Sequence, residues 1–167
     1  MPLIKDGTVQ DDTYTHVGPD EALPDGAVSV PLARFLEAPD QLLARNTAAG
    51  VRLEPEDDPA ALESHLDRLS LITVNFPKYT DGRGYSQAQL LRRRMGYRGE
   101  LRAVGHVLRD QILYMHRSGF DAFETERADL PTVQEALREL SAYYQPAADG
   151  ARSVFAARHA AADQQDG

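Results

Sequence analysis

The segment 81–86 (Asp-Gly-Arg-Gly-Tyr-Ser) has the residue types of an anion-binding loop. Gly82 and Gly84 would let the backbone approach a ligand closely or adopt positive φ. Arg83 adds positive charge, and Ser86 begins a capping-box pattern for the following helix. The free N–H groups and the dipole at such a helix start attract anions. The segment is a candidate site for phosphate, sulfate, sulfite or carboxylate. The alternative is a tight loop before a well-capped helix.

The same segment lacks a complete nucleotide-binding motif. Gly82-Arg83-Gly84 matches the start of a dinucleotide fingerprint, but Gln87 occupies the position of the third small residue. The Gly-Lys-Ser/Thr sequence of a P-loop is absent. The sequence accordingly predicts no bound cofactor.

Further polar residues follow another predicted strand. His106 comes directly after that strand, and Asp110 lies one turn into the next helix. Because loops after neighbouring parallel strands share one rim of a sheet, we expect both residues to lie near Asp81. The acid–base candidates are His106, Asp81 and Asp110. The predicted anion-binding or partner-binding residues are Lys78, Gly82, Arg83, Gly84, Tyr85, Ser86 and Arg109.

The sequence shows neither a catalytic triad nor a metal-binding spacing. No serine or carboxylate is visibly arranged with His106, and a lone loop histidine is more often a surface or hydrogen-bonded structural residue. No two histidines have HxH or HxxxH spacing, so we expect no histidine-based metal site. Whether the protein is an enzyme therefore stays open at this level.

Charge is distributed unevenly along the chain. The net charge of −8 argues against general nucleic-acid binding. Residues 78–117 hold nine basic and three acidic side chains, a net charge of +6, which leaves −14 for the rest. A positive zone on an acidic protein suggests one anionic ligand or one acidic partner surface. Solvated helix faces are the alternative.

Strand and helix patterns alternate around these residues. Leu71–Phe76 is β-branched and nearly continuously apolar, which is typical of a parallel strand covered on both faces. Further strands are predicted at 27–30, 51–53, 101–105 and 120–124. Each of the five is followed by a helical pattern, the last one beginning at Pro131. Asp58-Pro59 marks another helix start. Alternation with short loops indicates a parallel sheet with right-handed crossovers.

The predicted fold class is α/β, with alternating βα units around a small parallel sheet that is either open or partly barrel-like. Residues 3–17 add an N-terminal β-hairpin, whose turn is Lys5-Asp6-Gly7-Thr8. Five units are too few for an eight-stranded barrel. An incomplete sheet needs a protected edge, supplied by the hairpin or by a homodimer. The alternation in residues 120–124 suggests an edge strand.

The 167 residues suggest one domain over residues 1–146 and a weakly ordered tail over 147–167. Cysteine is absent, which excludes disulfides and Cys-bound metal centres. No apolar run reaches the ~18 residues of a membrane span, and the first residues lack the apolar core of a signal peptide. We therefore expect a cytoplasmic protein.

Three segments resemble the signature of one bacterial family. They are residues 75–86 (Asn-Phe-Pro-Lys-Tyr-Thr-Asp-Gly-Arg-Gly-Tyr-Ser), residues 96–105 (Gly-Tyr-Arg-Gly-Glu-Leu-Arg-Ala-Val-Gly) and the downstream runs 108–111 and 119–123. Over roughly Met1 to Pro146 the chain resembles DUF934, a family of unknown function often labelled a probable oxidoreductase involved in sulfite reduction. The family has no established catalytic residues to transfer.

The resemblance implies an accessory role in assimilatory sulfate and sulfite reduction, because the family's genes tend to lie beside those of sulfite reductase and phosphoadenylylsulfate reductase. Three hypotheses follow. The protein is a partner of one of these reductases, without a redox centre of its own. It is a small enzyme acting on an anionic substrate, with His106 or Asp81 as acid or base. Or it is a regulatory module that senses a sulfur metabolite.

Overall fold

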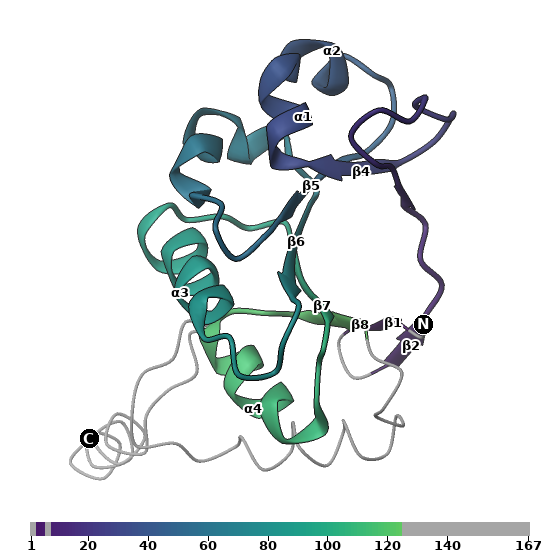
Figure 1. Ribbon diagram of the computed structural model, residues 1–167. Coiled ribbons are helices and arrows are strands. Elements are labelled where there is room, and N and C mark those ends of the chain that lie inside the picture. Colours follow the sequence, from purple (N-terminus) through teal and green to yellow (C-terminus); the bar gives the residue numbers. More distant parts are fainter. Residues whose placement is uncertain (1–2, 6–7, 125–167) are drawn as a thin grey trace, which may run out of the picture.

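Eight strands form one sheet that curls into a half-barrel (Figure 1). The computed structural model describes residues 3–5 and 8–124. The strand order is β2-β1-β8-β7-β6-β5-β4-β3. Strands β3 to β8 run parallel, whereas β1 pairs antiparallel with both β2 and β8. The sheet is therefore mixed, and the prediction of a parallel sheet holds only for its β3–β8 part.

The strands are β1 (Leu3–Lys5), β2 (Thr8–Gln10), β3 (Thr15–His16), β4 (Val28–Pro31), β5 (Ala49–Leu53), β6 (Leu71–Phe76), β7 (Glu100–Gly105) and β8 (Ala122–Glu124). The helices are α1 (Leu32–Glu37), α2 (Pro39–Leu43), η1 (Pro59–Arg68), α3 (Arg83–Gln89), η2 (Leu90–Arg94) and α4 (Arg109–Ser118). Of these, η1 is a 3-10 helix and η2 is a π-helical turn that continues α3.

The helices cover one face of the sheet and leave the concave face open (Figure 1). Parallel strands that are neighbours in both sequence and space, joined by crossovers of one hand, place every helix on the same side. The main core lies on that side, because alternate residues of each strand point to the helices. Its strand members include Val51, Leu53, Ile72, Val74, Phe76, Leu101, Ala103 and Phe123.

The N-terminal hairpin protects one edge of the parallel strands. Strand β1 pairs with β8, with Ile4 opposite Phe123. This confirms the hairpin as an edge cover, but the predicted range 3–17 was too long, because the hairpin consists of β1 and β2 whereas residues 15–16 form β3 beside β4 at the opposite edge. It also shows that the expectation of β8 as an edge strand was wrong, since β8 lies between β7 and β1 and buries both Ala122 and Phe123.

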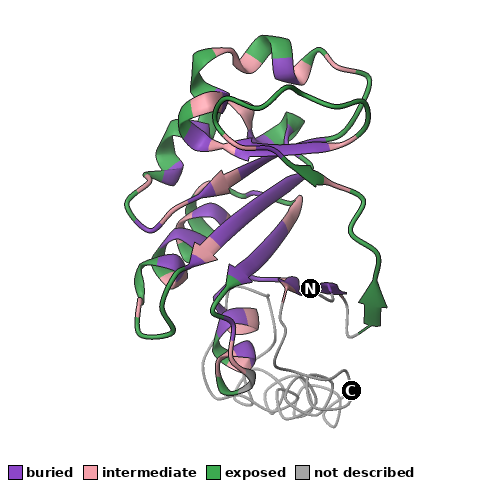
Figure 2. Ribbon diagram, turned by 45° about the vertical axis from the view of Figure 1, so that its right-hand side comes forward, coloured by how far each residue is buried: buried purple, intermediate pink, exposed green. Residues whose placement is uncertain are grey.

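After the hairpin the chain crosses the open side of the half-barrel. Strands β2 and β3 lie at opposite edges of the sheet, so the residues between them span the concave face (Figure 2). We call residues 11–16 the strap. The strap is mostly exposed to solvent, in contrast to the buried strands behind it.

The predicted elements agree best with the structure in the middle of the chain. Strand β6 has the predicted bounds, and the predicted cap at Asp58 accepts a hydrogen bond from Ala60 N at 3.0 Å. The predicted helix start at Ser86 was wrong. Helix α3 begins at Arg83, and Gly82 before it has no side chain to cap the helix.

Within residues 3–5 and 8–124, no helix combines the length and apolarity needed to cross a membrane. The predicted helix from Pro131 and the predicted tail from residue 147 lie outside the described residues.

Candidate functional site

The concave face carries polar side chains in layers near the carboxyl ends of the parallel strands. Arg52, Thr73 and Arg102 lie side by side on β5, β6 and β7. Two residues further along, Asn75 is level with Val104. Because alternate strand residues share a face, all five point away from the helices. The inner surface of the half-barrel is thus polar where it approaches the strand ends.

Two adjoining cavities open on this face. One has a volume of about 200 Å³ and is lined by His16, Arg52, Thr73, Asn75, Glu124 and residues 104–105. The other has about 300 Å³ and is lined by residues 16–19, residues 29–31, Arg52 and Glu54. Both have His16 and Arg52 in their walls. We call the two cavities together the lumen.

Two buried hydroxyls in the lumen lack a hydrogen-bond partner within the described residues. Thr73 is 0% exposed and Ser29 is 2% exposed, and neither hydroxyl oxygen makes a hydrogen bond there. Leaving a buried polar group unpaired costs about 1–3 kcal/mol, so such groups are rare in native proteins. The two hydroxyls are therefore poised to bond water or a ligand.

Arg52 presents a guanidinium to both cavities. Its Nε lies 3.0 Å from Glu54 Oε1, and Asn75 Nδ2 donates to Glu54 Oε2 at 2.6 Å. In the described part of the chain the two Nη groups of Arg52 make no hydrogen bond. Since a guanidinium has five N–H donors, most of its donors stay available to the lumen.

Arg102 holds the strap to the sheet from inside. Its side chain is 1% exposed. Its Nη1 donates to Asp12 Oδ2 at 2.7 Å, and its Nε donates to Glu100 Oε1 at 2.9 Å. Lys5 Nζ donates to Glu100 Oε2 at 2.9 Å. The four charges balance. Burial alone would raise the pKa of Asp12, but hydrogen bonds from Arg102 and from Tyr14 N–H outweigh burial and lower it.

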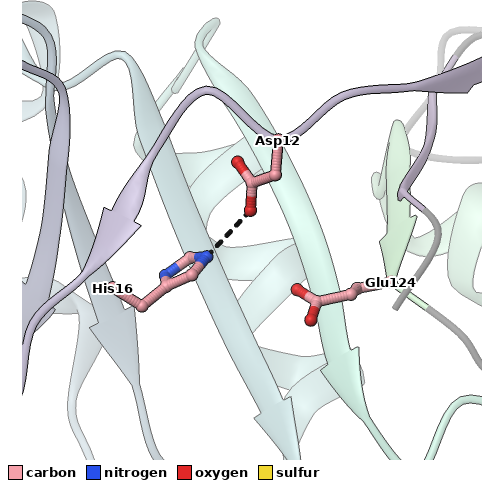
Figure 3. A group of neighbouring side chains, drawn as sticks. All are labelled: Asp12, His16 and Glu124. Atoms are coloured by element: carbon pink, nitrogen blue, oxygen red, sulfur yellow. Dashed lines mark hydrogen bonds and ion pairs between the residues drawn. The ribbon is translucent and has the colours of Figure 1, made fainter.

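Asp12, His16 and Glu124 meet at the strap side of the lumen (Figure 3). Asp12 and His16 come from the strap, whereas Glu124 comes from the end of β8. The Nε2 atom of His16 lies 3.0 Å from Asp12 Oδ2. One nitrogen or carboxylate oxygen from each residue lies within 4.8 Å of the other two. Glu124 has no ion-pair partner in the described ranges.

The predicted loop 81–86 neutralises its own charge. Arg83 Nε donates to Asp81 Oδ1 at 3.0 Å, and Arg83 Nη2 donates to Asp81 Oδ2 at 2.6 Å. The hydrogen bonds from the Arg83 side chain and backbone lower the pKa of Asp81 to about 2. Asp81 is therefore ionised near neutral pH. Lys78 is exposed nearby.

The glycines and Tyr85 of this loop are accounted for by packing of α3 on β6. A Cβ on Gly84 would lie 2.5 Å from Phe76 Cζ, so only glycine fits. Gly82 has a negative φ of −81° and open space around it. The ring of Tyr85 packs edge-on to Phe76 at 5.4 Å between centroids. Ser86 is exposed within α3.

The other predicted rim residues lie beside this loop. The His106 ring meets Tyr79 edge-on at 6.3 Å, and Gln111 Nε2 donates to Tyr79 O at 2.6 Å. The two loops therefore meet, as predicted for a shared rim. Asp110 is exposed in the first turn of α4, which Arg109 begins. No hydrogen bond joins His106 to a carboxylate of a described residue.

Part of the positive charge of residues 78–117 serves to stabilise the fold. Arg92 donates to three backbone carbonyls and one carboxylate, all at 2.8 Å: Tyr97 O, Gly99 O, Gly119 O and Asp121 Oδ2. A depression of about 420 Å³ lies around these residues. We do not assign it as the functional site, because the polar groups of Arg92 and Asp121 are already bonded to protein partners.

The lumen was missed by the sequence reasoning. The sequence pattern placed Glu124 at a strand end that belongs to the rim, but gave His16, Arg52 and Thr73 no role beyond the predicted hairpin and strands. A signal was present, since polar residues at alternate positions of parallel strands mark a face that no helix covers. The sequence pattern does not show that this face is concave or that the strap crosses it, because both depend on the curl of the sheet.

No curated protein matches the sequence. Residues 50–155 match a family described as bacterial protein of unknown function. The matched region covers more than half of the chain. It includes Arg52, Thr73 and Glu124 in the lumen, whereas Asp12 and His16 of the strap precede it. The chain belongs to DUF934, the family that its central segments resemble.

Proposed function

We propose that the lumen binds a small oxyanion and that the protein is an accessory of assimilatory sulfate and sulfite reduction. One observation carries the proposal: the buried hydroxyls of Thr73 and Ser29, which have no partner in the described residues, each line a cavity together with Arg52. The lumen also lies near the carboxyl ends of parallel strands, where folds of this kind bind ligands.

The donors of the lumen suit the oxygens of a small anion. A hydroxyl donates one hydrogen bond, and a guanidinium adds charge-assisted ones. Thr73 and Arg52 are neighbours across β6 and β5, so one ligand oxygen can accept from both. The 200 Å³ cavity equals roughly six or seven water molecules at ~30 Å³ each. This volume suits sulfite or sulfate better than a nucleotide.

The carboxylates of the lumen restrict which anion fits. Glu54 already offsets the charge of Arg52, and Glu124 adds a negative charge. An uncompensated dianion would be repelled. The lumen therefore favours an oxyanion that carries a proton, such as hydrogen sulfite, or an anion accompanied by a cation.

The resemblance of the chain to DUF934 implies a role in sulfite reduction, and this supports the choice of sulfur oxyanions as ligands. Sulfate assimilation handles small sulfur oxyanions, which are the ligand class proposed for the lumen. A protein that holds such a metabolite needs no redox centre of its own. The absence of cysteine is compatible with this role.

Docking on sulfite reductase or phosphoadenylylsulfate reductase is a second candidate role. It is favoured by basic side chains exposed outside the lumen: Lys78, Arg94 and Arg98. Exposed charges of this kind accelerate association with an acidic surface, and salt weakens the effect.

An enzymatic role at the predicted rim would use His106 as the base. Asp81 is a weak candidate, because its pKa of about 2 leaves it ionised and bonded to Arg83. Measuring turnover of His106→Ala on sulfur oxyanions and adenylyl sulfates would test this alternative directly.

The test of anion binding is the melting temperature of the full-length protein with sulfite, sulfate or adenosine 5′-phosphosulfate. Equimolar sodium chloride controls for ionic strength. A ligand at a hundred times its Kd stabilises by about 2.7 kcal/mol. For a chain of this length we expect a rise of about 5–10 °C.

The variant Arg52→Gln should abolish the rise, whereas Arg94→Gln and Lys78→Ala should retain it. No rise with any of the three anions would contradict the proposal. A rise lost in Lys78→Ala but kept in Arg52→Gln would move the site to the loop 81–86. Co-purification with either reductase at low salt, reduced in Lys78→Ala, would instead support the docking role.

A further inference from the structure

The strap brings together three side chains that are far apart in the sequence and that can share a cation. Asp12, His16 and Glu124 offer one imidazole nitrogen and two carboxylates (Figure 3). One donor atom from each residue lies within 4.8 Å of the donor atoms of the other two. None of these three side chains is among the donors used for the proposed anion site, although His16 and Glu124 line the same cavity as Thr73 and Arg52.

The distances approach those of a metal site. Donor atoms around a divalent ion with bonds of ~2.1 Å lie about 3–3.5 Å apart. Asp12 Oδ2 and His16 Nε2 are already 3.0 Å apart. The donor oxygen of Glu124 lies within 4.8 Å of both, so a change of its side-chain rotamer can complete the set.

Outer hydrogen bonds fix the orientation of the strap ligand. Tyr14 N–H donates to Asp12 Oδ1 at 3.0 Å, and Arg102 Nη1 donates to Asp12 Oδ2 at 2.7 Å. The first bond is a local turn that brings His16 back toward the carboxylate. Such second-layer bonds hold ligands in place and are a regular feature of metal sites. Because Arg102 already forms an ion pair with Asp12, Glu124 must supply the larger electrostatic attraction for a cation.

The charge balance of the lumen points to a cation. Lys5, Arg102, Glu100 and Asp12 balance one another, and Arg52 balances Glu54. Among the carboxylates that line the lumen, only Glu124 has no oppositely charged partner in the part of the chain that the structure describes. A half-buried carboxylate without a partner favours a bound cation.

A second, separate observation marks the same cavity as a binding site. Thr73 is fully buried, its hydroxyl has no partner in the described residues, and it lines the cavity together with His16 and Glu124. A hydroxyl in this position can bond a water or an anion held by a metal. Without such an acceptor its burial is unfavourable.

We propose that Asp12, His16 and Glu124 bind one divalent transition-metal ion of the Zn²⁺ class. Imidazole and carboxylate ligands without thiolate suit Zn²⁺ or Mn²⁺ better than Mg²⁺, which prefers oxygen and water. Three protein ligands leave a coordination position that faces Thr73 and Arg52. The ion ties the strap to the end of β8. The proposal does not depend on anion binding.

The experiment is calorimetric titration of the chelator-treated, full-length protein with Zn²⁺, and with Mn²⁺ and Mg²⁺ for comparison. One Zn²⁺ per chain is expected, with Mg²⁺ bound at least ~100-fold more weakly. His16→Ala and Glu124→Gln should each weaken Zn²⁺ binding by at least ~10-fold. Glu63→Gln, a carboxylate change on the exposed surface of η1, should leave it unchanged.

Cobalt provides a second readout. Co²⁺ bound by the three residues should give visible absorption bands that Zn²⁺ abolishes and that His16→Ala lacks. Circular dichroism in chelator checks that each variant is folded, and His16→Gln replaces His16→Ala if the latter is not. The proposal is overturned if the wild type does not bind Zn²⁺, or if both Glu124→Gln and the His16 variant bind it as tightly as the wild type. Anion-induced stabilisation of metal-free protein is a separate measurement, so either proposal can fail alone.

Discussion

Gly84 is restricted by its neighbour and not by its backbone angles. It lies in α3 against Phe76, where a Cβ would lie 2.5 Å from the ring. The sequence left two uses open for the loop glycines, a close approach to a ligand or a tight loop before a helix, because glycine allows both. Only the position of Phe76 distinguishes the two uses.

Gly84→Ala should destabilise the protein, since the added methyl overpacks a closed contact at a cost of about 1–3 kcal/mol. Gly82→Ala is the matched control. Its φ is −81° and nothing lies within 4 Å of the added Cβ, so its effect should be neutral or slightly stabilising. Urea denaturation of both variants measures the difference. Equal losses would refute the packing explanation.

Asp12 should make the free energy of unfolding depend on pH in the acidic range. Its pKa is lower in the folded protein than the ordinary value of 3.8. The ionised form is therefore favoured by folding, and the stabilisation is present above pH 4 and is lost as the pH falls through the folded pKa. Asp12→Asn should cost about 1 kcal/mol at pH 7 and flatten the acid dependence.

The neighbouring Asp11→Asn is the control for this measurement, because Asp11 is exposed. Denaturation midpoints between pH 2 and 7, in the presence of chelator, separate the two variants. An unchanged acid profile in Asp12→Asn would show that the Arg102 contact adds no pH-dependent stability.

At the scale of elements, Arg92 connects three segments that the sequence treats separately. From the π-helical turn η2 it reaches the carbonyls before β7 and after α4. Burial raises the pKa of its partner Asp121, although the charge of Arg92 acts against that rise. Within the run of three arginines at 92–94, Arg92 thus satisfies backbone carbonyl groups of the protein.

Arg92→Met should destabilise the fold by about 3 kcal/mol, because it leaves three carbonyls and a half-buried carboxylate without donors. Arg94→Met changes an exposed member of the same run and should stay within about 0.5 kcal/mol of the wild type. Thermal and urea unfolding compare them. Similar stabilities for the two variants would show that the hydrogen bonds of Arg92 do not stabilise the fold.

Helix α3 shows why element boundaries near functional-looking motifs are difficult to predict. The capping-box pattern pairs Ser86 with Gln89, but α3 begins three residues earlier, so Ser86 lies inside the helix. The buried Gln87 beside it donates to Glu54 O and Asp57 O and anchors this part of the helix to a neighbouring loop. Tertiary contacts therefore overrode a local signal.

For the whole molecule, the N-terminal hairpin is part of the same folding unit as the family-matched region. The match begins at residue 50, yet β1 extends the sheet beyond β8 and β4 pairs with β5. Ile4 is 1% exposed and belongs to the main core. The half-barrel should accordingly unfold in one transition.

Ile4→Ala should lower the free energy of unfolding by about 2–5 kcal/mol, because it opens a cavity in that core. Val9→Ala on β2 is the control and should be nearly neutral, since Val9 is 54% exposed. Chemical denaturation monitored at two spectroscopic probes measures both stability and cooperativity. A separate early transition in Ile4→Ala would show that the hairpin folds independently.

The sequence by itself determined the α/β class, the β6 strand, the N-terminal hairpin and the family. These depend on local patterns: apolar runs, turn residues and a long contiguous signature. Only the tertiary structure decided that the helices cover one face and that the sheet curls. It also placed Thr73 between two arginines and brought Asp12 and His16 to Glu124. Those relations join residues up to 112 positions apart, and no local pattern encodes which distant strand or strap a side chain will face.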